Sequence, residues 1–463
     1  KVKMSLLSRF NYNYRNTYYF TFTGRYDKAS NFAASYKGGF FPSGAFKWSS
    51  KNEEFLADVR WLDELSLRLS AGRTGNDGIS AYRSLGAMSS STSGYLFGGK
   101  QPLSYAPSRL ESKNLSWEKT DLYNAALDLS FLKSRLNVTV EAYLSYTKDL
   151  LLTPKLPTHT GYSSRYENLG KTHNKGIEVS IESRNIVTPK FSWRTNFTFS
   201  HNEQMVDDIG TYDEVSVFQS YGNNVFMMYG YKAGYPLNAL WGLQYEGIWH
   251  TQDEIARNEK TKTYISAAAA WYKPGYQKYL DVNQSGNIDS EDLVYLGNAD
   301  PWLYGGLQNT FKYNRLSLSV YLAYSLGGKI YNISEQWLGS GSYSTNQYRY
   351  MLDAYHSERN PYSDLPGAGN IDNLISSRMV HDASFLRLKN VSLSYVFDTK
   401  KITKNIIRDL TFTASGENLY LWKNYNGFDP DVNSSGTSST LRRIDNGAYP
   451  KSRTVIFSLQ VRY

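Results

Sequence analysis

The segment 136–147 alternates apolar and polar side chains over most of its length. Its even positions carry Leu, Val, Val, Ala, Leu and Tyr, and its odd positions carry Asn, Thr, Glu, Tyr, Ser and Thr. Because successive side chains of a β-strand point to opposite faces, this pattern predicts a strand with one apolar and one more polar face. Further strands are expected at 5–15, 18–26, 45–50, 65–74, 125–132, 177–186, 191–200, 316–325, 410–414 and 455–463. The sequence therefore predicts an all-β chain.

The connections between these strands alternate between short and long. Short turns are expected at 15–17, 133–135, 187–190 and 313–315, whereas long loops rich in Gly, Ser, Asn and Tyr occupy 75–119, 149–175, 206–232, 327–383 and 423–453. Outer-membrane barrels have short periplasmic turns and long extracellular loops, whereas a β-sandwich has no reason to sort its loops by length. We therefore expect an antiparallel transmembrane β-barrel, in which Val140 faces lipid and Thr139 faces the lumen.

The same alternation determines the direction of each strand. Strand pairs joined by short turns show which end of each strand is periplasmic, and the directions of the strands before 206 and after 303 then require an even number of strands between them. A clear strand at 237–249 therefore requires a second, weaker one near 276–281. The count is then about 15, and the last strand, 455–463, ends on the periplasmic side. An odd number of strands leaves an unpaired edge, which is costly in lipid. We expect 1–463 to be the C-terminal portion of a larger barrel.

Composition excludes several classes of protein. The 463 residues are 15% aromatic, include 40 Tyr and no Cys, and have a mean hydropathy of −0.52. No apolar run approaches the length of a transmembrane helix, and we do not expect residues 1–4 to be a signal peptide, because no apolar segment follows them. Without Cys there is no disulfide framework or thiolate metal site. The net charge of +9 is scattered rather than clustered, so we expect no nucleic-acid partner. A basic surface facing anionic lipid is an alternative use of this charge.

Seven sequence motifs occur in order along the chain. They are Trp-Glu-Lys-Thr at 117–120, Asn-Leu-Gly-Lys at 168–171 with Asn-Lys-Gly-Ile-Glu at 174–178, Tyr-Glu-Gly-Ile-Trp at 245–249, Gly-Asn-Ala-Asp-Pro at 297–301, Ala-Ser-Phe-Leu-Arg-Leu-Lys-Asn-Val at 383–391, Gly-Glu-Asn-Leu-Tyr at 416–420 and Gly-Phe-Asp-Pro-Asp-Val at 427–432. Together they span nearly the whole chain and closely resemble the barrel of the SusC/RagA family of TonB-linked outer-membrane transporters. The Asn-Ala-Asp-Pro sequence departs slightly from the family's usual Asn-Pro-x-Pro.

The resemblance implies a function and partners. Barrels of this kind have about 22 strands and a plugged lumen, so a plug, a TonB box and about seven strands would be absent from this chain. It also implies import of a large nutrient, a glycan or an oligopeptide, driven by the TonB complex and assisted by a SusD-like surface lipoprotein. Outer-membrane lipid and lipopolysaccharide would surround the barrel. A passive porin, a surface adhesin and a soluble glycan-binding protein remain the alternatives.

The segment 281–292 has the spacing of an EF-hand calcium loop. Its candidate ligands, with oxygen atoms at the required intervals and a Gly at the sixth position, are Asp281, Asn283, Ser285, Asn287, Asp289 and Asp292. Asp292 stands where Glu usually supplies two oxygens, so weak binding is expected. The alternative is a solvated polar turn without an ion.

Catalytic constellations are not evident. The six His residues, at 159, 173, 201, 250, 356 and 381, show no spacing typical of a metalloenzyme, and the sequence lacks a nucleophile elbow and a phosphate-binding loop. The chain is therefore not expected to be an enzyme, and we expect no catalytic residues.

Aromatic residues in the loops are the candidate substrate contacts, because flat rings stack on sugars and also suit contacts with peptides. They are Trp271, Trp302, Trp337, Tyr343, Tyr348, Trp422 and Tyr425. Anchoring at the lipid interface is the alternative role for each of them.

Overall fold

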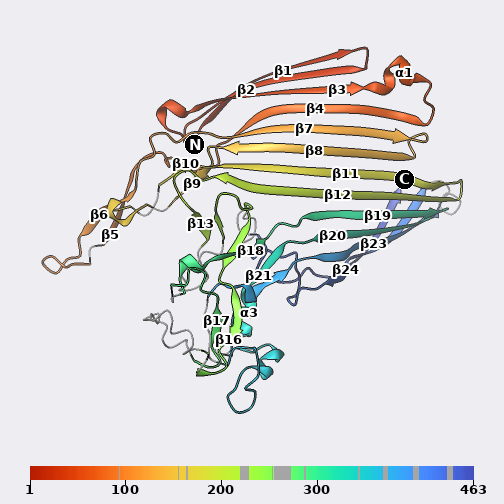
Figure 1. Ribbon diagram of the computed structural model, residues 1–463. Coiled ribbons are helices and arrows are strands. Elements are labelled where there is room, and N and C mark those ends of the chain that lie inside the picture. Colours follow the sequence, from red (N-terminus) through yellow and green to blue (C-terminus); the bar gives the residue numbers. More distant parts are fainter. Residues whose placement is uncertain are drawn as a thin grey trace. The chain divides into compact units, whose positions relative to one another are not determined.

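The computed structural model describes residues 1–462 apart from 93, 155, 163–164, 219–228, 253, 255–272, 286–287, 342–344, 369–373, 400–405 and 435–441. Its contacts divide the chain into two compact units, and Figure 1 labels their strands and helices. The first contains residues 1–187, 193–215 and 232–235, and the second contains 188–192, 216–231 and 236–463. Among the described residues, no helix combines the length and apolarity needed to cross a membrane.

Eight long strands form the wall of the first unit. In sheet order they are β1 (Lys3–Tyr14), β2 (Tyr18–Ala29), β3 (Gly38–Ser49), β4 (Leu62–Asn76), β7 (Glu118–Phe131), β8 (Leu136–Lys148), β11 (Lys171–Val187) and β12 (Phe191–Asp208). From β1 to β11 each strand pairs antiparallel with the next in this order. The strands predicted from side-chain alternation are thus confirmed, and most extend beyond their expected ends.

The turns at 15–17 and 132–135 are short and the connections 77–117 and 149–170 are long, as expected, but the connection 50–61 at the turn end is longer than the connection 30–37 at the loop end. Arg15 and Asn16 have positive φ angles of 53° and 54°, the conformation of a tight hairpin turn. The longer connections contain β5 (Ala87–Thr92) paired with β6 (Leu103–Arg109), and β9 (Leu151–Leu152) paired with β10 (Glu167–Asn168). Short helical segments complete this unit: η1 (Ala34–Tyr36), η2 (Ser50–Asn52), α1 (Glu54–Ala57) and η3 (Thr158–Thr160).

Five long strands form the wall of the second unit. They are β19 (Leu303–Tyr313), β20 (Leu316–Leu326), β23 (Phe385–Asp398), β24 (Asp409–Lys423) and β26 (Thr454–Arg462), each paired antiparallel with the next. The predicted terminal strand is present as β26, while Tyr463 lies outside the described residues. All-β antiparallel architecture is therefore confirmed.

Two expected strands do not join this sheet. The segments 237–249 and 276–281 form β15 (Ala239–Gly242), β16 (Tyr245–Ile248) and β17 (Gln277–Tyr279), which belong to small separate sheets. The reason is burial on both faces: Leu240, Trp241 and Leu243 are all at most 3% exposed. Such a run belongs to a protein core and not to a wall with one lipid face. Removing two strands from the expected count leaves it odd, so the predicted direction of the last strand is unchanged.

The loops of the second unit build their own folded layer. This layer contains three small sheets. In sheet order, the first consists of β13 (Val215–Phe218), β14 (Tyr229–Tyr231), β15 and β18 (Val294–Asn298). The second is the pair β16–β17, and the third consists of β22 (Val380–Asp382), β21 (Lys329–Asn332) and β25 (Ile444–Asp445). The helical segments are α3 (Ile333–Leu338), η5 (Ser290–Asp292), η6 (Arg349–Asp353) and η7 (Ser377–Met379). Their buried core draws residues from three different connections: Tyr229, Leu240, Ala299, Tyr331, Ile333, Ile375, Met379 and Ile444.

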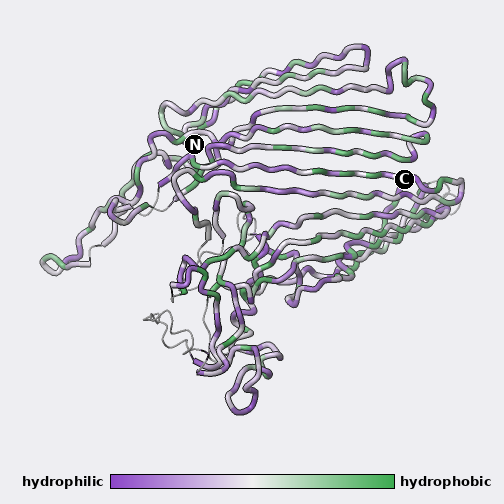
Figure 2. Tube along the Cα trace, viewed as in Figure 1, coloured by the Kyte–Doolittle hydropathy of each residue, from purple (hydrophilic) through white to green (hydrophobic). Residues whose placement is uncertain are grey.

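One face of the first unit's wall is polar and internally bonded. The Arg68 guanidinium donates to both carboxylate oxygens of Asp128, at 2.7 and 3.1 Å, and the Thr139 hydroxyl donates to Asp128 at 3.0 Å. Glu141 lies 3.9 Å from Arg68. Val140 points to the opposite face, and along the strands of Figure 2 apolar and polar residues alternate. Since only an apolar face suits hydrocarbon, Val140 faces lipid and Thr139 faces the lumen.

A bulge explains why the motif at 383–391 breaks simple alternation. Lys389 of β23 has no register partner on β20 or on β24. The pairing of β23 with each of these strands passes directly from Leu388 to Asn390. Asn418 of the Gly-Glu-Asn motif, on the facing strand, has a positive φ of 51°. The extra residue returns Leu388 to the same face as Val391, so the apolar face continues across the irregularity.

A buried ion pair ties the loop after β24 to the wall of the second unit. Arg387 donates to the Asp429 carboxylate at 2.6 Å, and the two side chains are 5% and 3% exposed. Burial alone would raise the pKa of Asp429, but hydrogen bonds from Arg387 and from the backbone N–H of Asp431, with the positive charge of Arg387, outweigh it and hold the pKa below its ordinary value. This ion pair therefore joins the motif at 383–391, which contains Arg387, to the motif at 427–432, which contains Asp429.

The assignment of faces predicts opposite responses to arginine at adjacent positions of β8. Val140→Arg should destabilise the folded protein by about 2–4 kcal/mol if it lies near the membrane midplane, because the charge would enter hydrocarbon. Thr139→Arg should have little effect, since Asp128 and Glu141 lie beside it. Urea unfolding in lipid vesicles measures both, and equal tolerance would contradict the barrel.

The ion pair predicts loss of stability in acid. Asp429→Asn should cost about 3–5 kcal/mol because Arg387 would remain buried without its charge partner. Because the folded pKa of Asp429 is depressed, its contribution is present above about pH 4 and is lost as pH falls through the folded pKa. The matched variant Asp431→Asn, at a side chain that is 47% exposed, should cost less than about 1 kcal/mol. Unfolding curves between pH 2 and 7 test this, and a pH response that persists in Asp429→Asn would contradict it.

Candidate functional site

Five of the seven predicted contact aromatics lie among the described residues, whereas Trp271 and Tyr343 lie outside them. The five belong to the second unit but occupy three different environments. Trp422 and Trp302 lie at the ends of wall strands, Tyr425 is in a core, and Trp337 and Tyr348 are in the loop layer.

Trp422 lies on the lipid-facing side of the wall. It pairs in register with Leu386, and its ring centroid is 4.7 Å from that of Tyr420, on the same face. Both rings are about half exposed. Trp302 precedes β19 and is also more than half exposed, with its ring packed close to Gly327. For Trp422 this placement favours the alternative role of an aromatic anchor at the membrane interface.

Tyr425 is a core residue. Its side chain is 3% exposed and packs with Ile330 and Ala383, and its hydroxyl donates to Asp445 at 2.7 Å. Burial and the neighbouring Asp445 carboxylate raise the pKa of Tyr425. In this structure the ring supports the loop layer and is covered from ligand, although only two residues separate it from Trp422.

Tyr348 lies in a cluster of aromatic and polar side chains around Glu335, and Trp337 lies two residues farther along the same helix, α3. Tyr348 and Tyr350 stack with ring centroids 5.6 Å apart. One Glu335 oxygen accepts from the Tyr350 hydroxyl at 3.2 Å, and the other lies 2.6 Å from His381 Nε2. Burial raises the pKa of Tyr350, as does the Glu335 carboxylate.

We call the residues Glu335, Trp337, Tyr348, Tyr350 and His381 the Glu335 cluster. Trp337 is 37% exposed, and Gln347 donates to its backbone oxygen at 3.4 Å. Rings with exposed area beside hydrogen-bonding groups suit recognition of a sugar or a peptide. Sequence reasoning missed Glu335, Tyr350 and His381, because no spacing signal connects residues up to 46 positions apart.

The predicted calcium loop is compact in the structure. Asp281 and Asn283 each accept a hydrogen bond from the Ser285 N–H, at 3.1 and 2.9 Å. The fully buried Asp292 accepts from the N–H groups of Val282 and Asp289, both at 2.8 Å. Asn287 lies outside the described residues. Within the described part of the chain, no three acidic or His side chains are grouped as a metal site, so amide, hydroxyl and backbone oxygens would have to complete any coordination.

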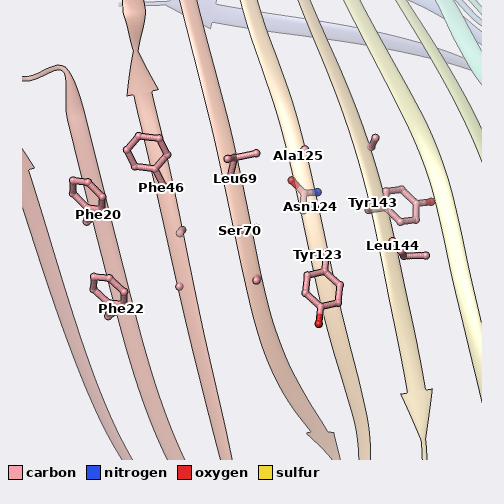
Figure 3. Close-up of a pocket in the computed structure, with 14 residues that line it drawn as sticks. Phe20, Phe22, Phe46, Leu69, Ser70, Tyr123, Asn124, Ala125, Tyr143 and Leu144 are labelled. Carbon is pink, nitrogen blue, oxygen red and sulfur yellow. The ribbon is translucent and has the colours of Figure 1, made fainter.

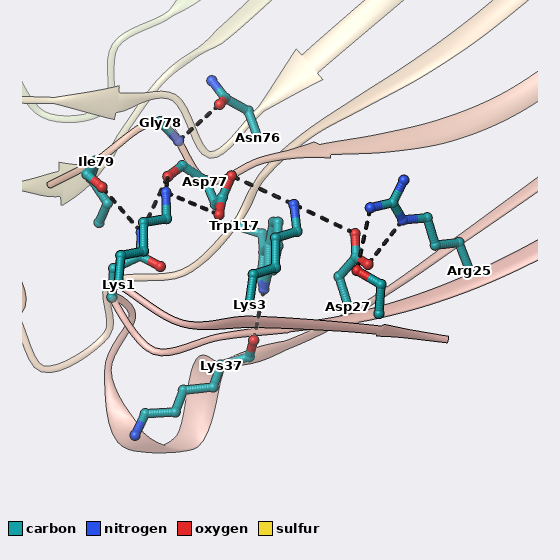
Figure 4. A network of polar contacts seen from close by, with 12 residues as sticks. Lys1, Lys3, Arg25, Asp27, Lys37, Asn76, Asp77, Gly78, Ile79 and Trp117 are labelled. Carbon is teal, nitrogen blue, oxygen red and sulfur yellow. Dashed lines mark hydrogen bonds and ion pairs between the residues drawn. The ribbon is translucent and has the colours of Figure 1, made fainter. Parts of the chain in front are cut away.

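The loop end of the first unit carries a charged network that the sequence did not reveal (Figure 4). Lys3 lies 3.8 Å from Asp27 and 3.7 Å from Asp77, and Arg25 donates to Asp27 at 2.9 Å. The Lys3 ammonium also lies 5.0 Å from the ring centroid of Trp117, whose indole N–H donates to a backbone oxygen. Trp117, the first residue of the Trp-Glu-Lys-Thr motif, is 1% exposed and therefore has a structural role.

Comparison with known proteins gives a consistent result. The model of the family described as "TonB dependent receptor-like, beta-barrel" matches residues 6–278. The TonB-dependent receptor P3 of Formosa agariphila is 31% identical over 99% of this chain and 45% of its own length. The TonB-dependent receptor SusC of Bacteroides thetaiotaomicron is also 31% identical, over 99% of this chain and 44% of its own length.

Solved structures agree on the fold. The RagAB peptide transporter superposes with a TM-score of 0.80 at 23% identity, covering 99% of this chain and 47% of that one. The chain spans slightly less than half the length of the curated relatives it matches. These relatives are named as receptors, not as enzymes. With a family model that matches more than half of its residues, the chain belongs to the TonB-dependent receptor-like β-barrel family of the bacterial outer membrane and is SusC/RagA-like within it.

Proposed function

We propose that the chain forms part of a transporter that imports a large nutrient across the outer membrane, driven by TonB and assisted by a SusD-like surface lipoprotein. The observation that carries this proposal is the similarity to SusC over 99% of the chain, which includes the loop layer as well as the wall. A glycan is the favoured substrate, because exposed aromatic rings such as Trp337 stack on sugar faces. An oligopeptide is the second candidate, supported by the fold shared with a peptide transporter.

Energy coupling separates this proposal from a passive porin or an adhesin. Uptake of labelled oligosaccharides and oligopeptides would be compared in cells that have or lack TonB, with and without a proton uncoupler. Energised import predicts that uptake stops in cells without TonB and in cells treated with the uncoupler, while binding to the cell surface persists. A porin would continue to pass small solutes, and an adhesin would bind without uptake. Co-purification of a surface lipoprotein tests the partner separately.

The Glu335 cluster predicts where substrate binds. Trp337→Ala and Tyr348→Ala should each weaken substrate binding roughly tenfold, the scale of one lost aromatic contact of about 1–1.5 kcal/mol. Trp422→Ala is the matched control, because that ring lies on the lipid-facing side. Isothermal titration of the purified protein measures the change. Equal losses in all three variants would show that the effect is general and not local to the cluster.

We also propose that the loop 281–292 binds calcium. The fit rests on the placing of oxygen atoms along the loop. Asp281 and Asn283 both accept from the Ser285 N–H, and the fully buried Asp292 accepts from the N–H groups of Val282 and Asp289. Burial raises the pKa of Asp292, as does the nearby Asp281 carboxylate, and a cation beside them would offset both effects. Asp289 would act through a water, and Asn287 through its carbonyl. The affinity expected for such a loop with Asp at its last position is weak, about 10⁻⁴–10⁻³ M.

Substitution within the loop tests calcium binding. Asp281→Asn should abolish terbium luminescence and calcium-dependent thermal stabilisation, because it removes one of the two anionic ligands. Glu291→Gln is the control, since the Glu291 carboxylate accepts from Asn283 at 2.8 Å but is not among the candidate ligands. If millimolar calcium gives neither signal in the unmodified protein, the loop is a polar turn without an ion.

A further inference from the structure

The lumen-facing side of the first unit's wall is hollowed at the loop end of β1, β2, β3 and β4. The hollow has a volume of about 460 Å³, within the range of roughly 300–1,000 Å³ that is typical of ligand pockets. It reaches from Lys3, at the start of β1, to Arg9, about halfway along that strand. Because long loops mark the extracellular end, the hollow opens toward the outside of the cell.

Pairing in the sheet places the floor of the hollow on the lumen side. Paired residues share a face, and Thr139, which faces the lumen, pairs with Asp128, which pairs in turn with Ser66. Ser70 lies on the same face of β4 as Ser66 and pairs with Ala45 of β3. Both Ser70 and Ala45 line the hollow, which is therefore open to the lumen and not to lipid.

Small side chains on β3 and β4 make the floor of the hollow deep. A Cβ atom at Gly72 would lie 2.8 Å from the Cβ atom of Ser43, so a larger residue at position 72 would displace its neighbour. Leu7, which is 60% exposed, adds an apolar surface at the side. The described residues that line the hollow include five with hydroxyl side chains, which are Thr21, Thr23, Ser43, Ser70 and Thr74.

The charge that the hollow exposes is positive. Asp27 is the single acidic residue among the described residues that line it, and its side chain is 5% exposed. Lys3 and Arg25 contact this carboxylate at 3.8 and 2.9 Å, and their own side chains are 34% and 44% exposed (Figure 4). Asp77 lies at the mouth and is paired with Lys1 at 3.0 Å. A ligand in the hollow would therefore meet the cations and not the buried carboxylate.

Arg9 and Arg25 lie diagonally across β1 and β2 on the lumen face. Arg9 pairs in register with Thr23, two positions from Arg25, which puts the backbones of the two arginines roughly 7–8 Å apart. The Arg25 Nε donates to Asp27, whereas no carboxylate of a described residue is paired with Arg9. Two guanidinium groups at this spacing can reach one oxyanion from both sides, and the fixed fork of donors on each matches the oxygens of such a group.

The opposite face of the same strands offers no such charge. Phe20, Phe22 and Phe46 lie there together with Tyr123, and the described residues that line the groove on that face include no charged side chain (Figure 3). The cations are thus concentrated on the lumen side, where lipid cannot reach them. Because the hollow opens at the outer end of the lumen, a molecule that enters from outside meets it before the periplasmic half.

We propose that this hollow binds an acidic sugar of the imported glycan, with the carboxylate or sulfate group between Arg9 and Arg25 and the sugar ring against Leu7. The proposal rests on the import function proposed above and deepens it, because it names an anionic glycan as the substrate class. Charge complementarity selects an anionic ligand. The hydroxyl side chains along the floor both donate and accept hydrogen bonds, as the hydroxyl groups of a sugar do, and this favours a glycan over a peptide.

The test compares binding of matched acidic and neutral glycans by the purified protein. Isothermal titration would use an oligogalacturonate with its carboxyl-reduced form, and a sulfated oligosaccharide with its desulfated form. At least one acidic member should bind more tightly than its neutral counterpart. Arg9→Gln should weaken binding of that acidic member roughly tenfold, the scale of one lost charge-assisted hydrogen bond, and should leave the neutral member unchanged. Arg9→Lys, which keeps the charge, should lose less.

Lys47→Gln is the matched control for charge. It removes one positive charge from the lumen face of β3, at a position that pairs with Arg68 and lies beside Glu64 and outside the hollow. This variant should bind both members of each pair like the unmodified protein. Equal losses in Arg9→Gln and Lys47→Gln would overturn the proposal, as would equal affinity for the acidic and neutral members of both pairs.

Filling the floor tests the hollow independently of its charge. Ala45→Phe should reduce binding of the acidic and the neutral members alike, whereas Ala125→Phe, on the lipid-facing side of β7, should not (Figure 3). Unchanged binding in Ala45→Phe would overturn the proposal. So would tighter binding of an acidic oligopeptide than of either acidic glycan, or an acidic side chain of the protein itself between the two arginines in an experimental structure.

Uptake experiments separate this proposal from the import function on which it rests. Import that depends on TonB but is restricted to neutral glycans would overturn the acidic-sugar site and leave the import function standing. Binding of the acidic glycan that depends on Arg9, without any uptake that depends on TonB, would support the site and overturn the import function instead.

Discussion

Hydrogen bonding of the backbone in hydrocarbon is the constraint on which this structure depends. Water cannot satisfy an N–H or C=O group in the bilayer, so each strand of the wall must pair along its length. The register is unbroken from Lys119 to Phe131 on β7 and from Leu136 to Lys148 on β8. Where β23 does depart from alternation, at Lys389, Asn418 on the facing strand adopts a left-handed conformation, and pairing resumes on both sides of the irregularity.

Most of the wall could be predicted from the sequence because the lipid and the lumen impose opposite demands on neighbouring residues. Val140 and Thr139 differ in polarity for that reason, and the period of two is visible without any knowledge of the fold. The segment 237–249 was placed in the wall incorrectly because an apolar run gives no sign of what covers it. Ala239 and Leu240 are buried on both faces of a small sheet, an environment that only distant segments of the chain create.

The candidate site was less predictable. Trp422 and Tyr425 are close in sequence and similar in chemistry, yet one lies on the lipid-facing side of the wall and the other in a core. The difference arises at the end of β24, where the chain leaves the sheet and contacts Ile330 and Asp445, residues that the local sequence cannot specify. Glu335 and His381 meet for the same reason, through the pairing of β21 with β22. The candidate ligands of the loop 281–292, in contrast, are local in sequence, and their spacing was sufficient to propose them.

The core of the loop layer has a consequence for how such a protein can change. Tyr229, Tyr331 and Ile444 come from three separate connections between wall strands, yet they pack into one cluster. A loop that shares its core with two others cannot be exchanged alone, because its replacement would leave cavities in both neighbours. Variation in what the protein recognises should therefore be inherited in blocks, with the three connections altered together while the strands beneath them stay the same.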